Sequence, residues 1–165
     1  MNLETTNLKI RDFLSDDVEE LYEILGDIEV MRYMEPAYDR NKTITFLNEF
    51  CIKEKGAFAC IHKNDNKLIG YLLFNTIEDN VYEIGWAFNK KYWGKGYAYE
   101  ACESVIKYAF DEIKVHKIFA ETIDNKKSIG LMKKLGMNLE GVLKSHTLDN
   151  DCNWCDVYMF GIVNN

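Results

Sequence analysis

The hydrophobic and polar positions of the chain follow two kinds of repeat. Apolar side chains that alternate with polar ones predict strands, because successive side chains of a strand point to opposite faces. Apolar side chains that recur every three to four residues predict helices with one buried face. The predicted strands span residues 7–14, 57–62, 68–76, 81–88, 117–123, 138–148 and 152–163. The predicted helices span residues 16–25, capped by Ser15, 42–55, 98–111 and 125–135, capped by Asn125.

These elements show no regular alternation of strand and helix. Three strands between residues 57 and 88 follow one another with only short polar turns, which predicts antiparallel neighbours. We therefore expect an α+β fold with one mixed, largely antiparallel central sheet of about seven strands and four helices, in the order βααβββαβαββ. No repeat or linker divides the chain, so residues 1–165 are expected to form a single domain.

Composition and charge narrow the class of protein. With 47% hydrophobic and 28% charged residues, the chain has the mix of an ordinary globular domain. Its longest apolar run is far below the roughly 20 residues of a membrane-spanning helix, and its first residues lack the apolar core of a signal peptide, so we expect a cytoplasmic protein with no membrane partner. The net charge of −7 argues against a nucleic-acid partner and favours a cationic one.

Five cysteines in a chain with no export signal predict free thiols. Cys152 and Cys155 form a C-x-x-C pair, but they lie between strand-like runs near the C-terminus, where a thioredoxin-like motif is not expected. The histidines are isolated and lack metal-ligand spacing, so no metal is predicted. A redox or zinc protein built on this pair is the alternative.

The segment between the strand 81–88 and the next helix carries a candidate anion site. Gly94 and Gly96 allow the backbone to approach a ligand and to present N–H groups at the positive end of a helix. Lys90, Lys91 and Lys95 add positive charge in an otherwise acidic chain. Neither a P-loop nor a dinucleotide-binding fingerprint fits the spacing. A tight strand-to-helix turn without a ligand is the alternative.

Within this segment, Lys91-Tyr-Trp-Gly94-Lys-Gly96 resembles the acyl-CoA pyrophosphate loop [QR]-x-x-G-x-[GA] of the GNAT N-acetyltransferase superfamily, with Lys91 in place of Gln or Arg. Asn125-Lys-Lys-Ser128, followed by Leu-Gly-Met at 135–137, is similar to the later N-x-x-S/A … L-G-F element of that family. The order of elements matches as well. Residues 11–25, 30–33, 83–86 and 140–144 resemble the ribosomal-protein N-terminal acetyltransferase group within it.

This resemblance implies that acetyl-CoA binds in a V-shaped opening between the strands 81–88 and 117–123. Gly85 independently indicates a bulge or a close approach inside the first of these strands. Asn125 is implied to reach the pantetheine from the other side, although a plain helix N-cap explains it equally well. The implied contacts are the backbone of Trp86, Ala87 and Phe88 for the pantetheine, and the N–H groups of Trp93, Gly94, Lys95, Gly96, Tyr97 and Ala98, beside Lys91, for the pyrophosphate.

Acetyl transfer to an amine needs a proton acceptor, a polarised thioester and a proton for the leaving thiolate. Glu83 is the candidate general base, acting through water, because a carboxylate on a mostly apolar strand is costly without a partner or a role. Many relatives donate the final proton from a tyrosine at the position of Met132, which has no such proton. Ser128 is then the candidate acid, and a local helix-start contact is its alternative.

The acceptor site is implied to lie between the loop 31–38 and the last hairpin. Glu35, Asp149 and Asp151 offer negative charge there, and Tyr38 and Trp154 are candidate walls. The favoured function is acetylation of a protein or peptide N-terminal amine by direct attack. The alternatives are acetylation of a small amine, such as a polyamine, amino sugar or amino acid derivative, and a non-catalytic acyl-CoA-binding module. The protein is expected to be a monomer or a homodimer.

Overall fold

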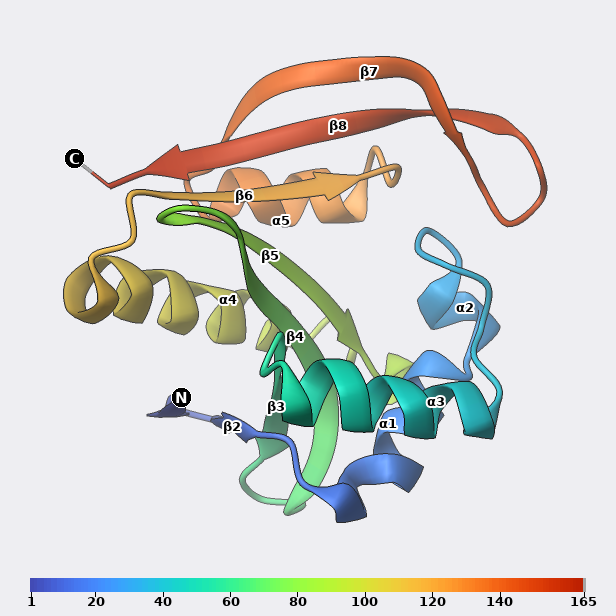
Figure 1. The fold of residues 1–165 in the computed structure, drawn as a ribbon, viewed down its shortest axis with the longest axis vertical. Helices are drawn as coiled ribbons and strands as arrows, with labels where there is room; N and C mark the ends of the chain where they lie inside the picture. Colours follow the sequence, from blue (N-terminus) through green and yellow to red (C-terminus); the bar gives the residue numbers. More distant parts are fainter. Residues whose placement is uncertain (165) are drawn as a thin grey trace.

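The computed structural model describes residues 1–164. Its eight strands form one sheet in the order β1-β2-β3-β4-β5-β6-β8-β7 (Figure 1). All neighbours are antiparallel except β5 and β6. The α+β prediction is confirmed, with β1 added, whose three residues are too short to show an alternation. The strands are β1 Asn2–Glu4, β2 Leu8–Asp12, β3 Ala57–His62, β4 Lys67–Glu78, β5 Val81–Phe88, β6 Lys117–Thr122, β7 Asn138–Leu148 and β8 Trp154–Val163.

Four of the helices follow the predicted pattern, with different ends, and the four-residue helix α2, Ile28–Met31, was not predicted. Wide π-helical turns, Leu47–Lys53 and Ala109–Ile113, continue α3 and α4. Ser15 does not cap α1, because it opens a 3-10 turn, Ser15–Asp17, in which the Asp17 carboxylate accepts from the Leu14 N–H at 2.8 Å. A second 3-10 turn is Lys90–Tyr92. The helices are α1 Val18–Leu25, α2 Ile28–Met31, α3 Arg40–Phe46, α4 Tyr97–Tyr108 and α5 Lys127–Lys134.

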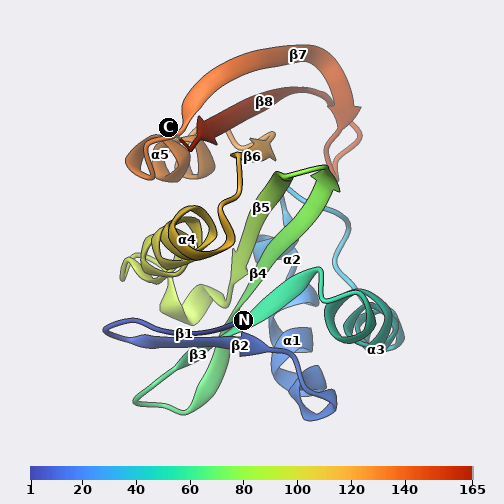
Figure 2. The same cartoon turned by 60° about the vertical axis from the view of Figure 1, so that its left-hand side comes forward.

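Helices cover both faces of the sheet, and each face has its own core (Figure 2). Side chains of β5 alternate between the two cores. Ile84 and Phe88 pack with α4, whereas Ala87 packs in the core that α1 and α3 complete. Gly85 and Glu83, two and four residues before Ala87, therefore lie on the α1 and α3 face.

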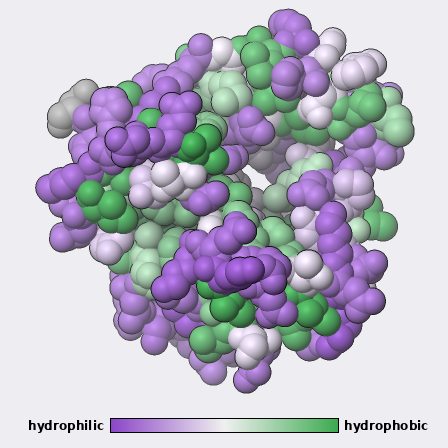
Figure 3. Space-filling model, in the orientation of Figure 1, coloured by the Kyte–Doolittle hydropathy of each residue, from purple (hydrophilic) through white to green (hydrophobic). Residues whose placement is uncertain are grey.

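The sheet divides at Glu83. β5 and β6 pair at only three positions, Val81 with Lys117, Tyr82 with Ile118, and Glu83 with Phe119. Beyond them β5 continues beside β4 as far as Phe88, while β6 continues beside β8. The two halves separate from this point, which gives the predicted V-shaped opening, and Figure 3 shows a hollow between them.

Gly85 lies just beyond the point of division and is not at a bulge. The pairing of β4 with β5 is regular from Thr76 and Tyr82 to Gly70 and Phe88, and the irregularity falls before it, between Thr76 and Glu78. A Cβ added at Gly85 would meet only Leu73, at an ordinary 3.5 Å. The predicted bulge is therefore wrong, and a close approach by a ligand stays a prediction.

Candidate active site

The free edge of β5 presents backbone groups to the opening. The Asn89 N–H donates to the Ile69 carbonyl at 2.9 Å, which sets the alternation of hydrogen-bonded pairs along β4 and β5. Backbone groups of Ala87 consequently point toward β4, and those of Trp86 and Phe88 point toward the opening. The Trp93 indole N–H already donates to the Phe88 carbonyl at 2.7 Å. Trp86 and the Phe88 N–H are thus placed to pair with an extended ligand as an added strand would.

The glycine loop between the 3-10 turn and α4 forms a cradle of backbone donors. Gly94 and Gly96 have φ of +75° and +84°, a region that favours glycine. Within residues 1–164, no backbone acceptor pairs with the N–H groups of Gly94, Lys95 or Gly96, and α4 begins directly after them. The Trp93 N–H is different, since it donates to the Lys90 carbonyl at 3.2 Å. The cradle therefore starts at Gly94, one residue later than predicted.

Lysines from two elements surround this cradle. Lys91 and Lys95 are exposed, as predicted for an anion site. Lys90 is not available, because its ammonium pairs with Asp27 at 3.1 Å and lies 3.6 Å from Glu29. Lys127, from the start of α5, lies 4.9 Å from the centre of the Trp93 ring, so the far wall of the opening contributes a cation that the sequence analysis missed.

Glu83 lies half-buried at the point of division, on the face toward α1 and α3. Burial, and then the negative charge of Glu121, raise the pKa of Glu83. Glu121 follows Phe119, the partner of Glu83 on β6, by two residues, so both carboxylates lie on the same face. A carboxylate with a raised pKa is a better proton acceptor for an ammonium group than an ordinary one. Glu121 was not predicted, because the residues of β6 alone do not distinguish it from other charged residues.

Ser128 lies at the start of α5 beside a carboxylate that the sequence analysis missed. Its hydroxyl donates to Asp124 Oδ2 at 3.2 Å and its N–H donates to the same oxygen at 3.0 Å. Burial alone would raise the pKa of Asp124, but these bonds and those from two further backbone N–H groups lower it. The Asp124 side chain, and not that of the exposed Asn125, accepts the backbone N–H groups at the start of the helix, so the predicted Asn125 cap is wrong. Met132 is 1% exposed and packs in the core.

Glu35 and Tyr38 lie in the loop that follows α2, on the face of the sheet that α1 and α3 cover, which is also the face of Glu83. The Tyr38 hydroxyl donates to Glu35 at 3.0 Å, and the Lys42 ammonium donates to the other Glu35 oxygen at 3.1 Å. Burial and the negative charges nearby, those of Glu83 and Glu35 among them, raise the pKa of the buried Tyr71. Tyr38 packs with Tyr71 and Ala87 in the core of this face. Glu35, the hydrogen-bond partner of Tyr38, therefore lies on the same side of the sheet as Glu83, and Lys42 offsets the charge of Glu35.

The hairpin of β7 and β8 is attached to that same loop. The Asn150 side-chain amide donates to the carbonyl oxygens of Met31 at 3.1 Å, Arg32 at 3.3 Å and Glu35 at 3.4 Å. Figure 1 shows the tip of the hairpin above α2. Trp154 is 67% exposed at the start of β8, and Asp149 accepts hydrogen bonds from within its own turn. Asn150 was missed, since a turn asparagine is an ordinary feature.

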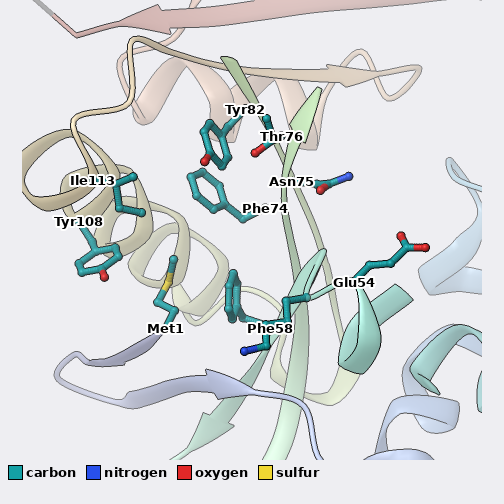
Figure 4. Close-up of a pocket in the computed structure, with 10 residues that line it drawn as sticks. Met1, Glu54, Phe58, Phe74, Asn75, Thr76, Tyr82, Tyr108 and Ile113 are labelled. Carbon is teal, nitrogen blue, oxygen red and sulfur yellow. The ribbon is translucent and has the colours of Figure 1, made fainter. Parts of the chain in front are cut away.

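A separate pocket of about 310 Å³ lies on the α4 face of the sheet (Figure 4). Phe74 and Tyr82 stack within it at 4.8 Å between ring centres, and Phe58 and Tyr108 complete its aromatic lining. None of the predicted site residues lines this pocket, so it is distinct from the opening at Glu83.

The remaining predictions concern thiols, metals and membranes. All five cysteines are free thiols, Cys152 and Cys155 included. Across residues 1–164, no three His, Cys, Asp or Glu side chains converge as metal ligands would. Over the same residues, every helix is too short or too polar to cross a bilayer.

Comparison with known proteins identifies the family to which this chain belongs. Residues 7–138 match the family model described as "Acetyltransferase (GNAT) domain". The chain is 34% identical over 166 residues to the "Uncharacterized N-acetyltransferase YnaD" of Bacillus subtilis, covering 99% of this chain and 97% of that one. It superimposes with a TM-score of 0.91 on a GNAT-family acetyltransferase from Bacillus anthracis, at 34% identity and 99% coverage of both chains. The chain therefore belongs to the GNAT family of acetyltransferases, as predicted, and is an acetyl-CoA-dependent enzyme.

A more distant relative has a named acceptor. The "[Ribosomal protein uS5]-alanine N-acetyltransferase" of Escherichia coli is 29% identical over 116 residues, which cover 67% of this chain and 59% of that protein.

Proposed function

We propose that this enzyme acetylates the N-terminal amine of a protein or peptide. One observation carries the proposal. The strands β5 and β6 separate at Glu83, which leaves one edge of β5 free. The glycine cradle lies beyond the end of this free edge. The loop after α2 and the β7–β8 hairpin, which border the proposed acceptor site, lie on the face of the sheet to which Glu83 belongs. A donor held along that edge and an amine arriving from the α2 side would meet beside Glu83.

The donor end of the site is suited to acetyl-CoA. The N–H groups from Gly94 to Ala98, with the positive end of α4, are suited to hold the pyrophosphate, and Lys91, Lys95 and Lys127 would add charge. The pantetheine would pair with the backbone of Trp86 and Phe88. Asn125, exposed at the start of α5, keeps its proposed contact with the pantetheine from the opposite wall.

The reaction we propose is a direct displacement. Glu83 accepts a proton from the ammonium group through water, and the neutral nitrogen attacks the thioester carbonyl carbon while a β5 backbone N–H polarises its oxygen. The C–N bond forms, the C–S bond breaks, and the thiolate takes a proton. The nitrogen loses its second proton to water, and a proton from water replaces the one that the donor gave to the thiolate. Ser128 is our candidate donor for the thiolate proton, and its hydroxyl must first turn away from Asp124.

The acceptor is inferred from charge and from one relative. Glu83 and Glu121 place two carboxylates at the point of attack, where they would attract a cationic amine. The uS5-alanine relative favours a protein N-terminus over a free small molecule. A polyamine is the second candidate, because the same two carboxylates suit a molecule with several ammonium groups.

The first test is thermal unfolding with acetyl-CoA, with ATP and NAD as controls. A ligand at about 100 times its Kd adds roughly 2.7 kcal/mol of stability, a clear rise in midpoint. Acetyl-CoA alone should produce it. Peptides with free and blocked N-termini, and polyamines, are then offered as acceptors, and products are weighed by mass spectrometry. Acetylation of polyamines and not of peptides would contradict the proposed acceptor, and an equal response to ATP would contradict the acetyl-CoA site.

A further inference from the structure

His62 lies behind the glycine cradle and takes no part in the chemistry proposed above. It ends β3 and is 8% exposed. Its Nε2 atom lies 3.0 Å from the Tyr97 hydroxyl, and its ring packs against those of Tyr92 and Tyr97, with centres 5.5 and 5.1 Å apart. A buried imidazole is costly unless its nitrogens are partnered, so an apolar residue would serve mere packing better.

Asp65, in the turn between β3 and β4, completes the contact. The Tyr92 hydroxyl donates to Asp65 at 2.6 Å, and His62 Nδ1 lies 2.9 Å from the same carboxylate oxygen, although not in hydrogen-bonding geometry. Tyr92 ends the 3-10 turn before the cradle, and Tyr97 is the first residue of α4. The two tyrosines therefore flank the cradle. Tyr92 is held by the β3–β4 turn, and Tyr97 by the end of β3.

The cradle itself has little else to hold it. A Cβ added at Gly94 or at Gly96 would meet nothing within 4 Å, so both residues border open space on that side. Glycines lose the most backbone freedom when they are ordered. A loop that must be ordered by its ligand binds that ligand more weakly than one already held in place.

We propose that His62 is a positioning residue for acetyl-CoA, which holds the pyrophosphate cradle in its binding conformation through the Tyr97 hydroxyl. The inference rests on the proposed placement of acetyl-CoA. It concerns the pyrophosphate end alone, since the cradle is separated from Glu83 by the length of the free β5 edge.

The test removes one tyrosine hydroxyl at a time. Tyr97→Phe keeps the aromatic ring and removes the hydroxyl that His62 contacts. Tyr99→Phe is the matched control, because that tyrosine lies on the same helix turn and its hydroxyl bonds to Glu103 at the surface. We expect the Kd of acetyl-CoA, measured by calorimetry, to rise about fivefold in Tyr97→Phe, the effect of one hydrogen bond, and to be unchanged in Tyr99→Phe.

Two further measurements distinguish a positioning role of the His62–Tyr97 contact from a general disturbance of the fold. S-Acetylpantetheine lacks the pyrophosphate, so its KM as a donor should be the same in Tyr97→Phe and in the unaltered enzyme. In a His62→Phe background, Tyr97→Phe should have no additional effect on the Kd of acetyl-CoA, because the partner is already gone.

The outcomes distinguish this inference from the proposed function. An unaltered enzyme that does not bind acetyl-CoA overturns both. An unaltered enzyme that binds acetyl-CoA, with a Tyr97→Phe variant that binds it equally well, overturns only the role of His62. A loss that is equal for acetyl-CoA and S-acetylpantetheine also overturns it, because the hydroxyl would then act on the fold in general.

Discussion

The Asp124 carboxylate accepts hydrogen bonds from both the hydroxyl and the N–H of Ser128. The same side chain also accepts from the N–H groups of Lys126 and Lys127, so three consecutive backbone N–H groups at the start of α5 bond to one carboxylate. Ser128 is thus held at the wall of the opening by a carboxylate that stays ionised. This arrangement joins the stability of α5 to the placement of the candidate proton donor.

Asp124→Ala should lower the free energy of unfolding by about 1 kcal/mol at neutral pH, the usual worth of a helix cap. Hydrogen bonds lower the pKa of Asp124 in the folded protein below its ordinary value of about 4. The stabilisation is therefore complete well above pH 4 and is lost as the pH falls through the folded-state pKa. Urea unfolding at pH 7 and pH 3 measures this. Asn125→Ala is the control, and a difference that persists undiminished in acid would contradict the assignment.

Ser128→Ala should lower kcat at least about tenfold while the Kd of acetyl-CoA is unchanged, if its hydroxyl protonates the thiolate. Ser104 offers a matched control, because its hydroxyl bonds to a backbone carbonyl of α4 far from the chemistry. Steady-state kinetics with the acceptor found by mass spectrometry measure both variants. A Ser128→Ala enzyme of full activity would leave Ser128 as a helix-start residue only.

Glu83→Gln should reduce kcat by at least about tenfold, because the amide cannot accept the proton. Glu121→Gln should instead shift the pH profile. Its charge raises the pKa of Glu83, so its removal lowers that pKa, and the acidic limb of kcat/KM moves to lower pH. An acidic limb that does not move in Glu121→Gln would show that Glu83 does not govern it.

Asn150→Ala should raise the KM of the acceptor several-fold and leave the Kd of acetyl-CoA unchanged. The amide joins the β7–β8 hairpin to the loop after α2, and both border the acceptor side. Asn153→Ala is the control, since the Asn153 side chain bonds to Asp149 within the same turn. Equal effects of the two substitutions would show that the turn matters and the contact across to the loop does not.

The sequence was sufficient for the parts of this structure that depend on local pattern. Alternation placed the strands from β2 to β8, and the glycine spacing located the cradle. Glu83 was found because a lone carboxylate on an apolar strand is unusual. The family resemblance added the opening between β5 and β6, which no local pattern indicates.

The residues that were missed make contacts between distant parts of the chain. Asn150 bonds to carbonyls 115 to 119 residues away, and His62 contacts a tyrosine 35 residues later. Such partners are chosen by tertiary packing, which a single sequence does not display. Asp124 was missed for a different reason: Asn125, its neighbour, is an equally good cap by type, and only the backbone decides between them.

Gly94→Ala and Gly130→Ala should have opposite effects on stability. Gly94 has a positive φ, where a side chain costs about 1 kcal/mol, so alanine should lower the thermal midpoint and weaken acetyl-CoA binding about fivefold or more. Gly130 lies inside α5 with nothing within 4 Å of an added Cβ, and alanine there should stabilise the protein by about 0.5 to 1 kcal/mol. Calorimetry of both variants, with and without acetyl-CoA, makes the comparison. A Gly94→Ala protein that binds acetyl-CoA as tightly as the unaltered one would mean that the pyrophosphate does not depend on the left-handed turn at Gly94.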